Sequence, residues 1–271
     1  MNFSVLMSIY YKEKADYLES CLESLANQTQ KATEWVIVQD GPIGKDLQMV
    51  IDKYKSLGNN IIDVKLEKNQ GLGLALREGI MHCNYEIVAR MDTDDIARKD
   101  RFEIQLKFLL ENNLDVCSSH IKEFEEDPSK IIAERKVPLS HNEIIKYQKK
   151  RSAFNHMAVM FKKESVLSAG NYKHCPLMED DMLWVDMILN GAICGNINDY
   201  LVFARTNQAM IVRRGGFSYF KKYRKARKQI YKTGYISYFQ YFKTNFIQFF
   251  ICIMPGFMRK LIFFKFLHKK K

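Results

Sequence analysis

The chain has 271 residues, 47% of them hydrophobic and 27% charged. It is therefore long enough to bury a core, and it is neither a disordered chain nor a protein with many membrane spans. The net charge of +11 is unevenly distributed, because no Asp or Glu follows Asp199 while the last 72 residues carry 17 Lys and Arg. The first 199 residues carry a net charge of −6. A basic C-terminal segment indicates an anionic partner, which can be nucleic acid, phosphate or membrane lipid.

The first hundred residues alternate between predicted strands and helices. Short apolar runs predict buried strands at 3–9, 34–40, 61–66 and 85–90. Apolar residues at helical spacing and glycine stop signals predict helices between them, near 18–26, 45–57 and 71–83. This alternation is typical of βαβ units with right-handed crossovers and a parallel sheet.

Beyond residue 100 the alternation is lost. Helices are predicted at 100–113, 140–150, 163–170 and 178–191, and strands at 114–121, 156–161 and 193–205. The first residues, MNFSVLMSIYYKEK, have no basic n-region and no long apolar core, so we expect a first strand there and no signal peptide. The six cysteines form no C-x-x-C pair, which indicates reduced, mostly buried thiols in a cytoplasmic protein.

Polar clusters follow each of the four predicted parallel strands. They are Ser8–Tyr10, Asp40–Gly41, the turn NQGLG at 69–73 and the acidic stretch Asp92–Asp95. Ligands of parallel sheets bind beyond the carboxyl ends of the strands, so these groups are predicted to converge on one crevice. The alternative is that each cluster is only a turn, since Asp, Asn and Gly are common in turns.

The segment RMDTDD places Asp92, Asp94 and Asp95 within four positions. Carboxylates this close repel one another unless a positive charge lies among them. They are hard oxygen ligands, so we expect Mg²⁺ or Mn²⁺ carrying a diphosphate. A D-x-D triplet alone is a weak signal, because Asp94 or Asp95 could simply cap a helix. A phosphohydrolase would carry such acids on its first strand, and no P-loop is present.

Taken together, these segments and others resemble family-2 glycosyltransferases of the GT-A fold, over roughly residues 3–205. The matching segments, in order, are SVLMSIYYKEKADYLESCLESLANQT, VIVQDGP, NQGLGLALREGI, YEIVARMDTDDIARKDRFEIQ and MEDDMLWVDMILNG. Two later segments, FNHMAVMFKKESVLSAGNY and ARTNQAMIVRRGGFSYF, are similar to bacterial transferases that build capsule, exopolysaccharide or O-antigen repeats, including the amylovoran-type subgroup. The resemblance implies an α/β, Rossmann-like fold with a mostly parallel central sheet flanked by helices.

We expect the chain to divide into a catalytic domain, to which the resemblance applies, and a tail with a different composition. Residues 1–212 would form the catalytic domain, with a nucleotide-sugar half at 1–99 and an acceptor half at 100–212. Residues 213–271 would form a basic, amphipathic, membrane-associating helical tail. The Q-x-x-R-W element of processive synthases is missing, so a single sugar is expected to be transferred per reaction.

Carried over to this chain, the family's donor site implies a role for each matching position. Ser8, Tyr10 and Asp40 would hold the uracil and ribose of a UDP-sugar, and Asn69 would join them. Asp92 would contact the ribose or the metal shell, and Asp94 would bind the Mn²⁺ or Mg²⁺ that bridges the two phosphates. Asp95 would be a third metal ligand or would orient the sugar.

The family's catalytic base matches Asp180 in MEDD, and the neighbouring Glu179 and Asp181 leave the register open by one position. An ionised carboxylate opposite a diphosphate leaving group suits in-line displacement with inversion at the anomeric carbon. Without the resemblance, three acids at the start of a helix are explained by the helix dipole alone.

Further candidates are His156, as a metal or acceptor contact, and Arg213 and Arg214, as partners of a phosphate on the donor or on a lipid-linked acceptor. Each has a plain alternative. His156 would be an ordinary hydrogen-bonded histidine, and the arginines would be two of the many basic residues in the tail.

Two other functions fit parts of the sequence. A nucleic-acid-binding protein could use KKYRKARKQIYK at 221–232, although the many carboxylates argue against a polyanion site. A nucleotidyltransferase shares the metal carboxylates but would need a Gly-rich, basic phosphate loop after the first strand, and none is present.

The tail from about residue 217 is predicted to lie on the cytoplasmic leaflet of the plasma membrane as amphipathic helices, beside a lipid-linked acceptor. Its apolar run at 246–258 has 13 residues, whereas a spanning helix needs about 20. The alternative is that this segment packs on the catalytic domain or on a second subunit.

Overall fold

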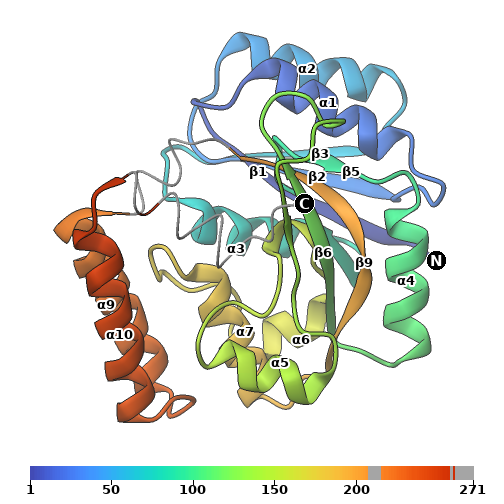
Figure 1. The fold of residues 1–271 in the computed structure, drawn as a ribbon. Helices are drawn as coiled ribbons and strands as arrows, with labels where there is room; N and C mark the ends of the chain where they lie inside the picture. The colour runs from blue at the N-terminus through green and yellow to red at the C-terminus, as the bar shows by residue number, and fades with distance from the viewer. Residues whose placement is uncertain (207–214, 257–258, 260–271) are drawn as a thin grey trace.

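The structure, a computed structural model, describes residues 1–206, 215–256 and 259 (Figure 1). Its first half runs β1 (Phe3–Ile9), α1 (Ala15–Ala26), β2 (Glu34–Gln39), α2 (Lys45–Ser56), β3 (Ile61–Lys65), α3 (Leu72–His82) and β4 (Ile87–Arg90). β1 pairs in parallel with β2 and β4, and β2 pairs in parallel with β3. The predicted alternation of strands and helices is therefore confirmed for this half.

The second half completes the same sheet in a mixed arrangement. It runs β5 (Ile96–Ala97), α4 (Arg101–Glu111), β6 (Val116–Phe124), β7 (Ala133–Arg135), α5 (His141–Gln148), the 3-10 helix η1 (His156–Ala158), β8 (Met160–Lys162), α6 (Lys163–Ser168), α7 (Glu179–Leu189) and β9 (Cys194–Arg205). The strand order is β3-β2-β1-β4-β8-β6-β9-β5, with β7 beside β6. β6 and β9 are parallel, whereas β8, β7 and β5 pair antiparallel with their neighbours.

Three local predictions differ from the structure. The strand predicted at 156–161 is wrong at its start, because residues 156–158 form η1 and the strand begins only at Met160. The Asn155 carbonyl accepts the Ala158 amide at 2.8 Å and closes this turn. Strands β5 and β7 were not predicted, since two or three residues cannot carry a recognisable alternation.

The sheet separates two hydrophobic core clusters. Phe3, Val5 and Met7 of β1 face α1, α2 and α4, while Leu6 of the same strand faces α3. This alternation is the period-2 pattern of a strand buried on both faces. The six cysteines are all free and buried, as expected for residues that fill the core.

Helix α3 lies unusually close to the sheet and to α7 because of two glycines. A Cβ at Gly79 would lie 2.6 Å from Val38 Cγ2, and one at Gly73 would lie 2.8 Å from Glu179 Cβ. Both distances are shorter than any comfortable contact, so larger residues would push α3 outward. The glycines thus bring the loop before α3 and the start of α7 together.

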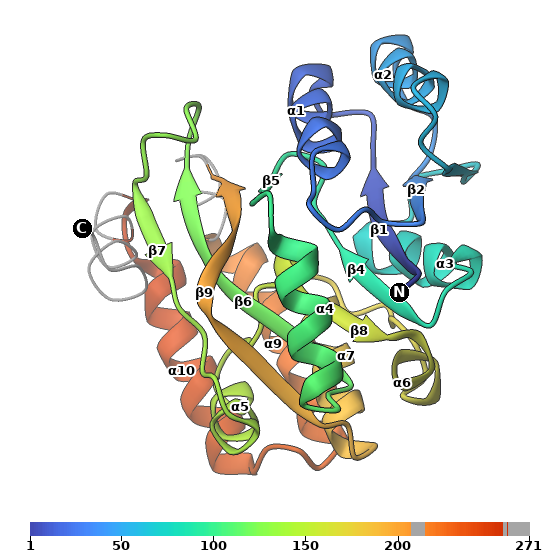
Figure 2. The same cartoon turned by 90° about the vertical axis from the view of Figure 1, so that its right-hand side faces the viewer.

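Two tail helices, α9 (Gly216–Lys232) and α10 (Tyr238–Ile253), form a hairpin beside α7 (Figures 1 and 2). Ala226 and Ile230 of α9 share a third core cluster with Met182 of α7. The Arg227 guanidinium donates to the Lys149 carbonyl at 2.8 Å, and the Tyr235 hydroxyl donates to the Ile145 carbonyl at 2.7 Å. The helical tail is confirmed over residues 216–253, and its first helix packs on the domain. The rest of the predicted tail, at 213–214, 257–258 and 260–271, lies outside the described residues.

The predicted division of the chain at residues 99 and 212 stays a prediction. One sheet runs through both predicted halves, since β4 pairs with β8 and β5 pairs with β9. The packing of α9 on α7 likewise ties the start of the tail to the domain that precedes it.

Replacing Gly79 by valine is expected to lower the free energy of unfolding by about 1–3 kcal/mol, the usual range for overpacking a core. The added side chain would meet Leu6 and Val38 under α3. Chemical denaturation measures the change. Glu78→Val is the matched control, because Glu78 is exposed one position earlier in the same helix. Equal losses for the two variants would contradict the close packing of α3.

Candidate active site

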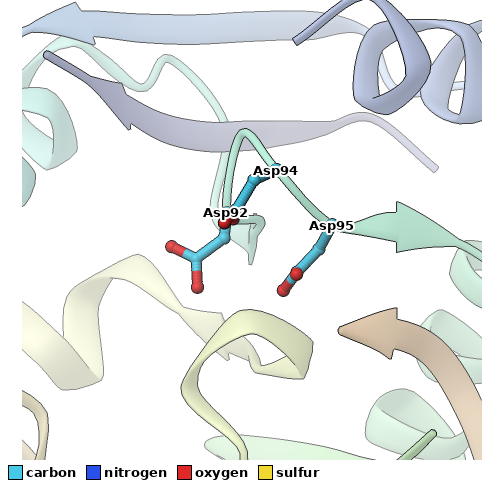
Figure 3. A group of neighbouring side chains, drawn as sticks. All are labelled: Asp92, Asp94 and Asp95. Carbon is cyan, nitrogen blue, oxygen red and sulfur yellow. The ribbon is translucent and has the colours of Figure 1, made fainter. Parts of the chain in front are cut away.

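The acidic turn between β4 and β5 is the centre of the candidate site (Figure 3). One ligand atom from each of Asp92, Asp94 and Asp95 lies within 4.8 Å of the others. Asp92 and Asp94 are half-buried, and Asp95 is 2% exposed. The turn follows the carboxyl end of β4, at the edge of the sheet where the sequence predicted convergence.

Part of the positive charge required here comes from Arg90, the last residue of β4. Its side chain is 1% exposed and forms an ion pair with Asp92. Its Nε and Nη1 atoms are buried and have no hydrogen-bond partner among the described residues. Sequence reasoning missed this counter-ion, although the spacing of two residues in a strand end places both side chains on one face.

Side chains from three other elements hold the backbone of the acidic turn. They donate to the carbonyl oxygens of every second residue: Arg101 Nη2 to Arg90 at 2.7 Å, Cys21 Sγ to Asp92 at 3.3 Å, and Arg205 Nε to Asp94 at 3.1 Å. A turn bound in this way has little freedom, so its carboxylates are presented in a fixed arrangement.

The carboxylates of the turn are poorly hydrated and repel one another. Burial, and then repulsion from Asp92, raises the pKa of Asp94 to about 6. Burial, followed by the charges of Asp94 and Asp92, also raises the pKa of Asp95 well above its usual value. The same acids and, above all, burial raise the pKa of Glu13 to about 7. Sequence reasoning missed Glu13, because nothing local to the loop after β1 connects it with a turn 80 residues later.

The acidic turn fits a divalent cation. Asp95 Oδ1 accepts the Arg205 amide at 2.7 Å, whereas Asp95 Oδ2 is buried with no partner among the described residues. Carboxylate oxygens are the ligands that Mg²⁺ and Mn²⁺ prefer, and a cation would offset the repulsion that raises these pKa values. Asp92 and Asp94 would hold it, with Asp95 Oδ2 as a third oxygen.

Asp40, after β2, shapes the loop that precedes α3. Its carboxylate accepts the Gln70 amide at 2.7 Å and the Gly71 amide at 2.9 Å, and the Asn69 side chain donates to its carbonyl at 3.1 Å. Gly41 has φ +84°, and a Cβ there would lie 2.7 Å from the Asn69 nitrogen. The predicted donor residues Asp40 and Asn69 are thus brought together, and their contacts with a nucleotide stay predictions.

The other predicted donor residues lie at the same end of the sheet. Ser8 lies near the end of β1, and Tyr10 is the first residue after that strand. Both residues are half-buried. The Asp40 amide donates to the Ile9 carbonyl at 2.7 Å, which joins this strand end to Asp40. Arg213 and Arg214 lie outside the described residues, so the structure does not bear on their predicted phosphate contacts.

Three acids occupy the first turn of α7. Burial raises the pKa of Asp180, and burial with the Asp180 charge raises the pKa values of Glu179 and Asp181 to about 7. Asp181 is bound from outside the helix, since its Oδ1 accepts Gln148 Nε2 at 2.7 Å. The charge of Arg90 acts on Glu179 and Asp180 as well as on Asp94, which indicates that α7 begins near the acidic turn.

His156 lies in η1 and contacts α7 through Trp184. Its Nε2 is 2.7 Å from the Tyr172 hydroxyl, and its ring contacts Trp184 edge-on at 5.9 Å between centroids. Burial, and then the charge of Arg90, lowers its pKa well below the usual value, so the imidazole is neutral. Its predicted role as a metal or acceptor contact stays a prediction.

Comparison with known proteins agrees with this geometry. Residues 4–167 match the model of the family described as "Glycosyl transferase family 2". An uncharacterized glycosyltransferase of Haemophilus influenzae is 39% identical over 270 residues, 99% of this chain and 100% of its own length.

Two further relatives carry specific names. The UDP-Gal:alpha-D-GlcNAc-diphosphoundecaprenol beta-1,3-galactosyltransferase of Escherichia coli is 39% identical over 97% of this chain and 95% of its own length. The amylovoran biosynthesis glycosyltransferase AmsE of Erwinia amylovora is 42% identical over 81% of this chain and 82% of its own length.

Solved structures share the fold. TarS 1–349 of S. aureus, in complex with UDP-GlcNAc, matches with a TM-score of 0.65 at 20% identity, over 84% of this chain and 66% of that chain. The mannosyltransferase PcManGT from Pyrobaculum calidifontis, in complex with GDP-Man and Mn²⁺, matches with a TM-score of 0.63 at 15% identity, over 85% of this chain and 64% of that chain.

These relatives do not support the nucleic-acid-binding and nucleotidyltransferase alternatives. The expected α/β GT-A fold is confirmed, with its mixed sheet, flanking helices and helical tail. With a family match over more than half its length and relatives that cover almost all of it, the chain belongs to the family-2 glycosyltransferases.

Proposed function

We propose that this enzyme transfers one sugar from a UDP-sugar to a lipid-linked saccharide in bacterial surface polysaccharide synthesis, with inversion at the anomeric carbon. The observation that carries the proposal is the pairing of an acidic turn with the acids of α7 at one edge of the sheet. The donor and acceptor in the name of the Escherichia coli relative support the substrate class.

Each part of the donor has a partner in this arrangement. Ser8, Tyr10 and Asp40, with Asn69, would bind the uridine, and Asp92 and Asp94 would hold Mn²⁺ or Mg²⁺ near the diphosphate. The cation supplies charge neutralisation for the departing diphosphate. Arg90 holds the Asp92 side chain in place through their ion pair.

Asp180 would act as the base. It would take the proton of the acceptor hydroxyl while that oxygen bonds to the anomeric carbon and the bond to the diphosphate breaks, releasing UDP. The contact between Asp181 and Gln148 supports this register, since Asp181 is already bound to α5. Glu179 lies close to Gly73 of α3, on the side of the loop at residues 69–71 that precedes α3, here called the donor loop.

Replacing Asp94 by alanine is expected to abolish metal-dependent UDP binding and to leave the fold intact, because Asp94 lies on a turn outside the hydrophobic core. Calorimetry of UDP with and without Mn²⁺ measures binding, and the melting temperature reports the fold. Asp52→Ala, an exposed acid on α2, is the control. Affinity for UDP and Mn²⁺ equal to that of the wild type would rule out the metal site.

Replacing Asp180 by asparagine should preserve UDP binding and lower kcat by roughly 10²–10⁴-fold, the usual effect of losing a general base. Since burial raises the pKa of Asp180, the wild-type kcat should rise with pH through a range above the ~4 of an ordinary Asp. Asp181→Asn is measured in parallel. If only that second variant loses turnover, Asp181 is the base.

The outer face of α10 supports the membrane part of the proposal. A stripe of exposed apolar side chains runs along it: Phe239, Phe242, Phe246, Phe250 and Ile253, with exposures of 47–72%. Exposed lysines and arginines cover α9 beside it. None of the described helices has both the length and the apolarity that a membrane span requires. An in-plane contact with anionic lipid, on the cytoplasmic face, suits this combination.

Flotation with liposomes tests this contact. The full-length protein should float with anionic liposomes, less so at high salt, and Phe242→Ser with Phe246→Ser should reduce flotation. Deleting the tail is a poorer test, because α9 covers a core cluster. The control is Met49→Ser with Leu57→Ser, which removes two apolar residues, one in α2 and one directly after it, that are more exposed than the two phenylalanines. Failure of the wild type to float would contradict the proposal, and a change in oligomeric state would assign the stripe to a second copy.

A further inference from the structure

The end of β9 meets the acidic turn because of the sheet topology. β5 follows the turn directly and pairs antiparallel with β9, with Ile96 opposite Phe203. The last residue of β9, Arg205, therefore lies beside the turn, and its amide donates to Asp95 Oδ1 at 2.7 Å. This contact joins residues 110 positions apart.

The guanidinium of Arg205 connects the acidic turn to a second loop. Its Nε donates to the Asp94 carbonyl at 3.1 Å, while its Nη1 donates to the Glu125 carbonyl at 3.1 Å and the Glu126 carbonyl at 3.3 Å. These carbonyls follow β6, the neighbour of β9. A planar group with several donors in a fixed fork can satisfy both segments at once.

Two aromatic rings fix the plane of this guanidinium. Its central carbon lies 3.8 Å from the ring centroid of Tyr17 and 4.6 Å from that of Phe124. The Tyr17 hydroxyl in turn lies 3.2 Å from a carboxylate oxygen of Glu126 and accepts from Lys14 at 3.1 Å. Arg205 thus contacts α1, β6 and the acidic turn together.

We propose that Arg205 is a positioning residue for the metal-binding turn, setting the direction of the Asp94 carboxylate through the carbonyl of the same residue. The inference rests on the proposed function, since it assumes that Asp94 binds the cation. Arg205 contacts neither substrate nor cation in this scheme. It stabilises the turn in advance, so that less free energy is lost in ordering the ligands when the cation binds.

The test compares Arg205→Met and Arg205→Lys with wild type in calorimetric titrations of Mn²⁺ into enzyme with UDP, and in kcat as a function of Mn²⁺ concentration. Arg205→Met should raise the half-saturating Mn²⁺ concentration about tenfold or more, and high Mn²⁺ should restore kcat to within a few-fold. Arg205→Lys keeps the charge without the planar fork, so its requirement for Mn²⁺ should also rise, by a smaller factor.

Arg98→Met is the matched control. Like Arg205, Arg98 donates to a backbone carbonyl, that of Tyr200 at 3.1 Å. Its acidic partners, Asp100 and Asp199, lie outside the acidic turn. The Arg98→Met variant should lose about as much melting temperature as Arg205→Met. Its half-saturating Mn²⁺ concentration should nevertheless equal that of the wild type.

Three outcomes separate the inference from the proposed function. Metal-dependent UDP binding in the wild type, with unchanged Mn²⁺ dependence in both Arg205 variants, would overturn the inference alone. Equal shifts for Arg98→Met and Arg205→Met would reduce Arg205 to a general stabiliser and overturn it too. A wild type that binds UDP without regard to Mn²⁺ would overturn the proposed metal site, and the inference with it. If Arg205→Met does not fold, Arg205→Lys decides.

Discussion

The crowding of carboxylates at the end of β4 is the constraint on which the rest of the site depends. Like charges in a poorly hydrated corner are tolerated only when cations and donors surround them. Arg90 provides the nearest charge through its ion pair with Asp92, and Arg205 binds the backbone of Asp94. Burial, together with the repulsion that remains, raises the pKa values of Asp94 and Asp95. A divalent cation bound by the turn would offset that repulsion.

The charge of Arg90 acts on both the acidic turn and the proposed base. Arg90 is buried, and its charge acts both on Asp94, in the turn that would hold the cation, and on Asp180, which would be the base. Gly73 allows α3 to approach the start of α7, so the donor loop and the acids of α7 lie next to each other. In the proposed reaction, donor binding and proton removal would therefore depend on one packing arrangement rather than on two independent sites.

The tail packs on the domain, which is one of the two alternatives that its sequence suggested, and it also leaves an apolar surface exposed. Its first helix packs on α7 and α5, with Arg227 almost fully buried, so part of the basic segment belongs to the core packing of the domain. Its second helix packs on the first and leaves an aromatic stripe exposed. A rigid connection of this kind would hold the active site at a fixed orientation to any surface that the stripe contacts.

The sequence by itself determined the parallel first half of the sheet, the family and the residue types at the strand ends, because periodicity and short motifs are local. Only the tertiary structure decided which side chains support the acids. Arg205 reaches Asp94 across 111 positions, and Gln148 reaches Asp181 across 33, through strand pairings and helix contacts that leave no local pattern. The short strand β5 decides the first of these contacts, and two residues are too few to reveal a strand in sequence. The roles of Glu13 and Arg90 at the site were likewise decided by the tertiary structure, since burial and neighbouring charge are properties of the packed chain.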